Sequence, residues 1–117
     1  MVDEPVIIWN TRDPLAGRSP EQFEHEVRSM LAGRVEAAYI FGSYGTKKFG
    51  RNSDVDMMLV VKTDKPFVER ALDFGELMDL VPDMDLLVYT PLEFQKLAGD
   101  PSPGFWTSVV ESIRRVV

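Results

Sequence analysis

Two aspartates separated by one residue, Asp54 and Asp56, stand at the start of an apolar run that extends from Met57 to Val61. Because side chains in a strand alternate between faces, both carboxylates project to the same side, with Cα atoms roughly 6 to 7 Å apart. The run after them is apolar at successive positions, which predicts a strand covered on both faces. Two like charges at the rim of such a strand need a compensating cation. Carboxylate oxygens of this kind, together with substrate phosphates, suit Mg²⁺ or Mn²⁺.

A second candidate feature is the pair Gly42 and Ser43, which follows an apolar run ending at Phe41. Glycine permits a sharp turn and close approach of the backbone to a ligand. Ser43 could cap a short helix whose free N–H groups point at an anion, so phosphate oxygens would fit there. If the loop from Tyr44 to Ser53 folds back, the second strand runs antiparallel to the first. The Gly-Ser turn and the two aspartates then face one pocket.

Three basic residues, Lys47, Lys48 and Arg51, crowd this loop. Beside a phosphate pocket they would steady a triphosphate or neutralise charge that develops in the transition state. The alternative is an ordinary solvated loop, in which none of the three contacts a ligand.

The remaining elements must bring these residues together. We expect a first strand from Val35 to Phe41 and a helix from Asp64 to about Val81, where an apolar stripe precedes Pro82. A crossover of that length is what a parallel strand pair needs, so Met84 to Tyr89 should lie parallel to the strand from Asp54 to Val61. The start of that last strand would then share a rim with the two aspartates.

Other segments are expected to pack around this sheet. Ser19, Pro20 and Gln22 predict a capped helix start, and the helix would end near Gly33 with one apolar face. We interpret His25 as a solvated side chain away from that face. The remaining expected elements are a capped helix from Thr90 to about Leu97, a helix from Phe105 to Val117, and an edge strand, packing arm or tail over Pro5 to Trp9.

The motif Phe41-Gly42-Ser43, followed eleven positions after Ser43 by Asp54-Val55-Asp56 and an apolar run, resembles the signature of the DNA polymerase β type nucleotidyltransferase superfamily. It is most similar to the small, free-standing minimal nucleotidyltransferases, over about Glu36 to Phe94. The resemblance implies an α+β, two-layer nucleotidyltransferase fold, in which helices pack on one side of a small mixed β-sheet.

The resemblance also implies roles for single residues. Gly42 and Ser43 would hold nucleotide phosphates, and Asp54 and Asp56 would bind two divalent ions. A third carboxylate on a later strand completes such sites, and Asp85 matches it by standing inside a strand entrance. Its neighbour Asp83 is more simply a turn residue after Pro82, and Asp85 itself could instead be a structural acid that pairs with a lysine or a backbone amide.

The activity implied is metal-dependent transfer of a nucleoside monophosphate, with AMP expected, from a nucleoside triphosphate to an acceptor hydroxyl. Minimal members resemble antitoxins that pair with a helical HEPN-type partner, so a helical partner protein or a second copy is expected to supply the acceptor site. The sequence departs from the family at Gly45-Thr46-Lys47, where an Ala-Arg-Gly run is more usual, and Lys47 or Lys48 would replace the missing arginine only as a point charge. A non-catalytic module that scaffolds or neutralises a partner, a metal-dependent phosphohydrolase and a chance match on a plain α/β domain stay open as alternatives.

Composition limits these readings. The 117 residues fit a single domain over positions 1–117, and the net charge of −6 disfavours a non-specific nucleic-acid binder. The sequence has no cysteine, which agrees with a cytoplasmic location. Its longest central apolar run is far shorter than a membrane span of about 20 residues, and its acidic start is unlike a signal peptide.

Overall fold

The structure is a computed structural model that describes residues 13–47, 49–50, 53–99 and 113–117. Its elements are, in chain order, helix α2 (Pro20–Leu31), strands β1 (Ala37–Phe41) and β2 (Val55–Val60), helix α3 (Phe67–Arg70), the 3-10 helix η1 (Ala71–Phe74), helix α4 (Gly75–Met78), strand β3 (Met84–Tyr89), helix α5 (Pro91–Gly99) and strand β4 (Arg114–Arg115). No helix among the described residues is long and apolar enough to cross a membrane.

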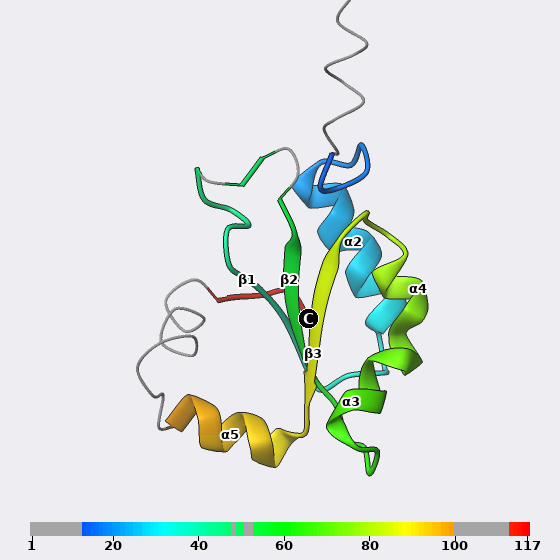
Figure 1. Cartoon of the computed structure of the whole chain (residues 1–117), viewed down its shortest axis with the longest axis vertical. Coiled ribbons are helices and arrows are strands. Elements are labelled where there is room, and N and C mark those ends of the chain that lie inside the picture. Colours follow the sequence, from blue (N-terminus) through cyan, green and yellow to red (C-terminus); the bar gives the residue numbers. More distant parts are fainter. Residues whose placement is uncertain (1–12, 48, 51–52, 100–112) are drawn as a thin grey trace, which may run out of the picture.

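The four strands form one mixed sheet in the order β3-β2-β1-β4 (Figure 1). Strand β2 runs antiparallel to β1 and parallel to β3, as the sequence predicts. The register places Phe41 opposite Asp56 on one side, and Asp85 opposite Asp56 on the other. Strand pairing therefore brings the end of β1 and the starts of β2 and β3 to one edge of the sheet.

Helix α2 begins with the predicted capping box. The Ser19 hydroxyl accepts a hydrogen bond from the Gln22 backbone N–H at 3.1 Å, and the Gln22 side chain accepts one from the Ser19 N–H at 2.8 Å. These bonds satisfy backbone donors that the first turn of a helix leaves without partners. Helix α5 begins in the same way, since the side chains of Thr90 and Glu93 each accept from the backbone N–H of the other.

The prediction of one long helix from Asp64 to about Val81 is wrong, because the segment is divided into α3, η1 and α4. Pro66, rather than Asp64, stands at the N-cap of α3. The backbone of Phe74 (φ −123°, ψ 33°) leaves the helical region and redirects the chain before α4. This break lets Phe74 and Leu77 both reach the core, whereas Phe67, the first residue of the expected stripe, is 44% exposed.

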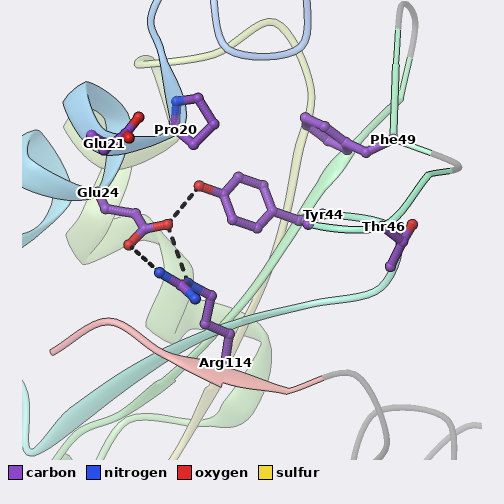
Figure 2. A pocket seen from close by; sticks show the side chains of 8 residues that line it. Pro20, Glu21, Glu24, Tyr44, Thr46, Phe49 and Arg114 are labelled. Atoms are coloured by element: carbon purple, nitrogen blue, oxygen red, sulfur yellow. Dashed lines mark hydrogen bonds and ion pairs between the residues drawn. The ribbon is translucent and has the colours of Figure 1, made fainter.

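The prediction of a helix from Phe105 to Val117 is wrong for the C-terminal part of that segment. Residues 105–112 of that helix, like the segment from Pro5 to Trp9, lie outside the described residues. Arg114 and Arg115 form strand β4, which pairs antiparallel with Ile40 and Tyr39 of β1. An edge strand leaves backbone N–H and C=O groups available for pairing, and β4 satisfies part of this edge. The register also directs the Arg114 side chain to Glu24 of α2 (Figure 2).

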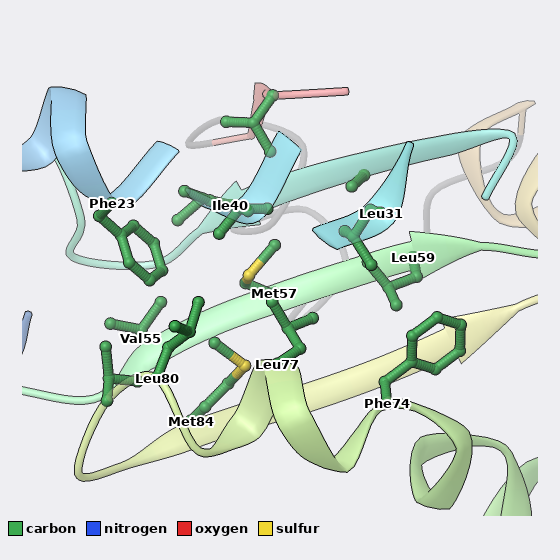
Figure 3. Packing of buried hydrophobic residues seen from close by; sticks show 14 of the residues in the cluster. Phe23, Leu31, Ile40, Val55, Met57, Leu59, Phe74, Leu77, Leu80 and Met84 are labelled. Carbon is green, nitrogen blue, oxygen red and sulfur yellow. The ribbon is translucent and has the colours of Figure 1, made fainter. Parts of the chain in front are cut away.

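The main core fills the space between the sheet and the helices α2 and α4 (Figure 3). Its fully buried members include Phe23 and Leu31 of α2, Met57 and Leu59 of β2, and Leu77 of α4. The opposite face carries a smaller cluster of buried and partly buried side chains to which α5 contributes: Tyr39, Phe41, Met58, Leu87, Tyr89, Phe94, Leu97 and Ile113. The structure is thus the expected α+β fold with a mixed sheet, but the prediction that the helices pack on one side only is wrong. Helices α2 and α4 cover one face, whereas Phe94 and Leu97 pack α5 against the other.

This core predicts a matched pair of stability effects. Leu59 is completely buried and Leu72 is 78% exposed. We expect Leu59→Ala to lower the free energy of unfolding by about 2–5 kcal/mol, because the substitution leaves a cavity under the sheet. Leu72→Ala should change it by less than about 0.5 kcal/mol. Chemical denaturation of the two variants tests this, and equal losses would contradict the assignment of Leu59 to the core.

Candidate functional site

The carboxyl groups of Asp56 and Asp85 lie side by side on neighbouring parallel strands. Both side chains line a cavity of about 330 Å³ together with Phe41, Leu86 and Leu87. Because Asp56 pairs with Phe41 as well, this cavity opens where three strands of the sheet meet. A polar pair on an apolar floor is typical of a binding site.

The surroundings of Asp56 resist its ionisation. Its pKa is raised from 3.8 to about 6, first by burial, then by the hydrogen bond with Asp85, and then by the negative charges of Asp85 and Asp54. Within the described part of the chain, no lysine or arginine forms an ion pair with any of these three acids. The negative charge of the site is therefore uncompensated by the described side chains.

The other two candidate acids differ from this pair. Asp54 is exposed, immediately before β2, and its charge acts on Asp56. Asp83 stands before β3, where its backbone carbonyl accepts a hydrogen bond from the Val55 N–H at 3.1 Å, and it does not line the cavity. Among the described residues, no group of three or more His, Cys, Asp or Glu side chains is arranged to hold a metal ion. The geometry therefore joins Asp85, and not Asp83, to Asp56, with Asp54 nearby rather than converged with them.

Gly42 lies directly against Asp56. Its backbone has a φ of +78°, which an L side chain rarely adopts. A Cβ atom at this position would overlap the Oδ2 atom of Asp56 and approach its Cγ atom to 3.3 Å. Glycine is thus needed both for the turn out of β1 and for the close approach of the backbone to the Asp56 carboxylate.

Residues 42–45 form a turn, not the short helix that the sequence suggested after Ser43. The carbonyl oxygen of Ser43 accepts hydrogen bonds from the backbone N–H of Thr46 at 2.9 Å and from its hydroxyl at 2.6 Å. Lys47 is exposed in the following loop, while Lys48 and Arg51 lie outside the described residues. The structure therefore brings Gly42 to the Asp56 carboxylate and places the Ser43 backbone beside it in the turn.

A buried acid that sequence reasoning missed lies on the other side of the turn. Glu24 of α2 is only 6% exposed, and its carboxylate accepts hydrogen bonds from Tyr44 and Arg114 (Figure 2). It also accepts one from Arg28. A signal was present in the sequence, because Glu24 falls three residues before Val27 on the apolar side of the helix. An acid at such a position needs buried partners.

A known protein family matches most of the described part of the chain. The family model described as Polymerase beta, Nucleotidyltransferase matches residues 25–115, which include the turn, the acids of β2 and β3, and strand β4. No curated protein and no solved structure matches the chain.

The position of Gly42 predicts how an added methyl group acts. Gly42→Ala should lower the free energy of unfolding by more than the roughly 1–2 kcal/mol that a left-handed backbone alone imposes on an L residue. Gly33→Ala is the matched control, since Gly33 also has a positive φ of +76° but has no atom within 4 Å of an added Cβ. In the double variant Gly42→Ala with Asp56→Ala, the overlapping carboxylate is absent, so the added methyl group should lower the free energy of unfolding by less. Denaturation of the four proteins tests this, and identical losses for the two glycine variants would contradict the contact with Asp56.

The raised pKa of Asp56 predicts a dependence of stability on pH. The folded protein holds this proton more tightly than the unfolded chain, so stability should fall as pH rises from 3.8 to about 6 and then level off. Asp56→Asn mimics the neutral form, and in buffer without divalent cations it should be more stable than the natural protein above about pH 6, but not below 3.8. Thermal unfolding across this range checks the sign. A variant that is less stable at high pH and equal at low pH would show that the carboxylate is stabilised, not strained.

Proposed function

We propose a function from one premise, that the chain belongs to the Polymerase beta, Nucleotidyltransferase family. The protein transfers a nucleoside monophosphate, with AMP as the expected group, from a nucleoside triphosphate to an acceptor hydroxyl and releases pyrophosphate. The observation that carries this proposal is the pair of carboxylates, Asp56 and Asp85, in one cavity against the Gly42 turn.

The carboxylates fit a divalent cation. Asp56 and Asp85 place hard oxygen donors side by side, and burial, followed by the interactions with Asp85 and the charge of Asp54, raises the pKa of Asp56. Mg²⁺ or Mn²⁺ takes one or two protein carboxylates and completes its coordination with waters and substrate phosphates. Asp56 and Asp85 would hold one such ion, and Asp54, exposed at the rim, would help to hold a second.

Different residues of the chain would have different roles in the reaction. Bound divalent ions would supply positive charge at the phosphates and at the transition state. The backbone at Gly42 and Ser43 would bind the terminal phosphates, and Lys47, with Lys48 and Arg51, would add positive charge from the loop. Asp85 would accept the proton of the acceptor hydroxyl, whose oxygen forms the new bond to the α-phosphorus as the bond to the pyrophosphate oxygen breaks. No protein side chain is bonded covalently to the nucleotide.

The acceptor would be presented by a second protein. The described residues make up one small sheet with its helices, so a helical partner of the HEPN type, or a second copy of this chain, would complete the acceptor site. The apolar side chains exposed on α3, η1 and α5 support such a contact: Phe67, Val68, Leu72 and Leu92. This arrangement supports an antitoxin role, in which the partner is both bound and modified.

A second candidate is a non-catalytic module that keeps the fold and binds its partner. The sequence feature that favours it is the run Gly45-Thr46-Lys47, which has no arginine where the family resemblance leads us to expect one. Lys47 is exposed and provides only a point charge without a bidentate fork. Nucleotide binding that requires Mg²⁺ but leads to no transfer would support this candidate over the enzyme.

Transfer activity is tested with radiolabelled ATP, Mg²⁺ or Mn²⁺, and candidate acceptor proteins including the chain itself. We expect a labelled acceptor and released pyrophosphate. Asp54→Asn, Asp56→Asn and Asp85→Asn should each lower the rate about 100-fold or more, since each removes a charge that holds a catalytic ion.

Asp83→Asn is the control, because Asp83 adjoins the same strand but does not line the cavity. It should transfer at close to the natural rate. Loss of transfer in Asp83→Asn together with full activity in Asp85→Asn would show that Asp83, and not Asp85, is the third carboxylate of the site. Equal labelling by the natural protein and Asp56→Asn would reject the proposed site.

A further inference from the structure

We infer that Glu24 is a positioning residue for nucleotide binding, because it holds the Gly42–Gly45 turn in place through the hydroxyl of Tyr44. This inference rests on the proposed function, in which the turn binds phosphates. It assigns a role to a residue of α2 that lies on the side of the turn away from the carboxylates.

Tyr44 is the link between helix and turn. Its hydroxyl donates a hydrogen bond to Glu24 Oε2 at 2.7 Å, and the tyrosine is only 8% exposed. Its ring packs against Phe23 of α2 at 6.2 Å between centroids, and against Phe49 at 5.3 Å. The ring thus contacts both the helix and the far limb of the loop, as Figure 2 shows for the side facing Glu24 and Phe49.

Glu24 is itself fixed from two further directions. Arg114 of β4 donates to both of its carboxylate oxygens, each at 3.2 Å, and Arg28 donates to Oε1 at 3.3 Å. Arg28 also donates to the Val116 carbonyl at 2.9 Å, which ties the same helix to the C-terminal segment. The acceptor for Tyr44 is therefore a carboxylate whose orientation is set by two guanidinium groups, and not a freely rotating side chain.

The charge states keep this link intact. Burial alone would raise the pKa of Glu24, but hydrogen bonds from Tyr44 and Arg114 and the charges of Arg114 and Arg28 lower it overall. Burial and the bond to Glu24 raise the pKa of Tyr44. Glu24 stays an anionic acceptor and Tyr44 a neutral donor around neutral pH, so the bond joins a charged to a neutral group and belongs to the stronger class.

The turn is thereby restrained at three successive points. Gly42 rests against Asp56, Tyr44 is bound by Glu24, and Thr46 donates to the Ser43 carbonyl. The Cα atoms of neighbouring residues are about 3.8 Å apart, so a displacement of Tyr44 is carried directly to Ser43. Loss of the Glu24 contact should loosen the phosphate-binding backbone without moving the carboxylates of β2 and β3.

The test uses Tyr44→Phe, which removes the hydroxyl but keeps the ring between its aromatic neighbours. We expect the Kd of ATP with Mg²⁺, measured by calorimetry, to rise about tenfold, in line with the loss of one hydrogen bond to a charged group. Binding of Mn²⁺ alone should stay unchanged, since Asp56 and Asp85 are untouched. Backbone amides of residues 42–46 should exchange with deuterium faster than in the natural protein, with or without nucleotide.

Glu93→Gln is the matched control, because Glu93 accepts two hydrogen bonds from the buried Arg70 far from the turn. It should leave both Kd values and the exchange of residues 42–46 unchanged. Glu24→Gln retains an acceptor for Tyr44 and should bind nucleotide better than Glu24→Ala. Unchanged nucleotide binding and unchanged exchange in Tyr44→Phe would overturn the inference even if the natural protein binds ATP. Natural protein that binds no ATP would instead overturn the proposed function, while faster exchange in Tyr44→Phe would still support the Glu24 restraint on the turn.

Discussion

The close approach of two carboxylates on adjacent parallel strands is the constraint on which the site depends. Parallel pairing of β2 with β3 sets Asp56 opposite Asp85, and antiparallel pairing with β1 brings the Gly42 turn to the same edge. The main core on the other face of the sheet holds this register, because a slip of one residue would take Met57 and Leu59 of β2 out of that core and turn Asp56 and Met58 into it. The two carboxyl groups are thereby held close together, and the pKa of Asp56 is raised by its burial and by its neighbours Asp85 and Asp54.

Two layers of contacts surround the turn that leaves β1. On the carboxylate side, the absence of a Cβ at Gly42 allows contact with Asp56. On the helix side, Glu24 gathers Tyr44 and Arg114, and so connects α2, the turn and β4. The turn lies between the carboxylates of Asp56 and Asp85 on one side and, on the other, the buried anionic Glu24, whose charge is paired with Arg114 and Arg28. Such support from a rigid neighbour is what a loop needs to bind a ligand reproducibly.

The sheet and its helix starts could be predicted from the sequence because their signals are local. Alternation and apolar runs indicated β1, β2 and β3, and the capping boxes at Ser19 and Thr90 marked the starts of α2 and α5. The break at Phe74 could not be predicted, since a continuous helical stripe and a broken one share the same spacing, and tertiary packing of Leu77 decides between them. The strand at Arg114 was also missed, because its partner is an edge of β1 more than 70 residues away in the chain.

Within the site, the sequence pattern identified Gly42, Asp56 and Asp85, which lie together. It also suggested a helix after Ser43 that the structure replaces with a turn. Glu24 was overlooked because an acid inside an amphipathic helix is usually solvated, and only the folded structure shows Tyr44 and Arg114 converging on it. Spacing along the chain can therefore suggest which residues meet at a strand edge, but it does not reveal partners contributed by distant elements.

The cation site that we propose at Asp56 and Asp85 can be tested by following the Asp56 carboxyl carbon by NMR during a pH titration, with and without Mg²⁺. We expect a midpoint at about 6 without the ion, and a clear shift to lower pH when Mg²⁺ is added, because a bound cation favours the ionised form. A midpoint near the ordinary value of 3.8, unaffected by Mg²⁺, would contradict it.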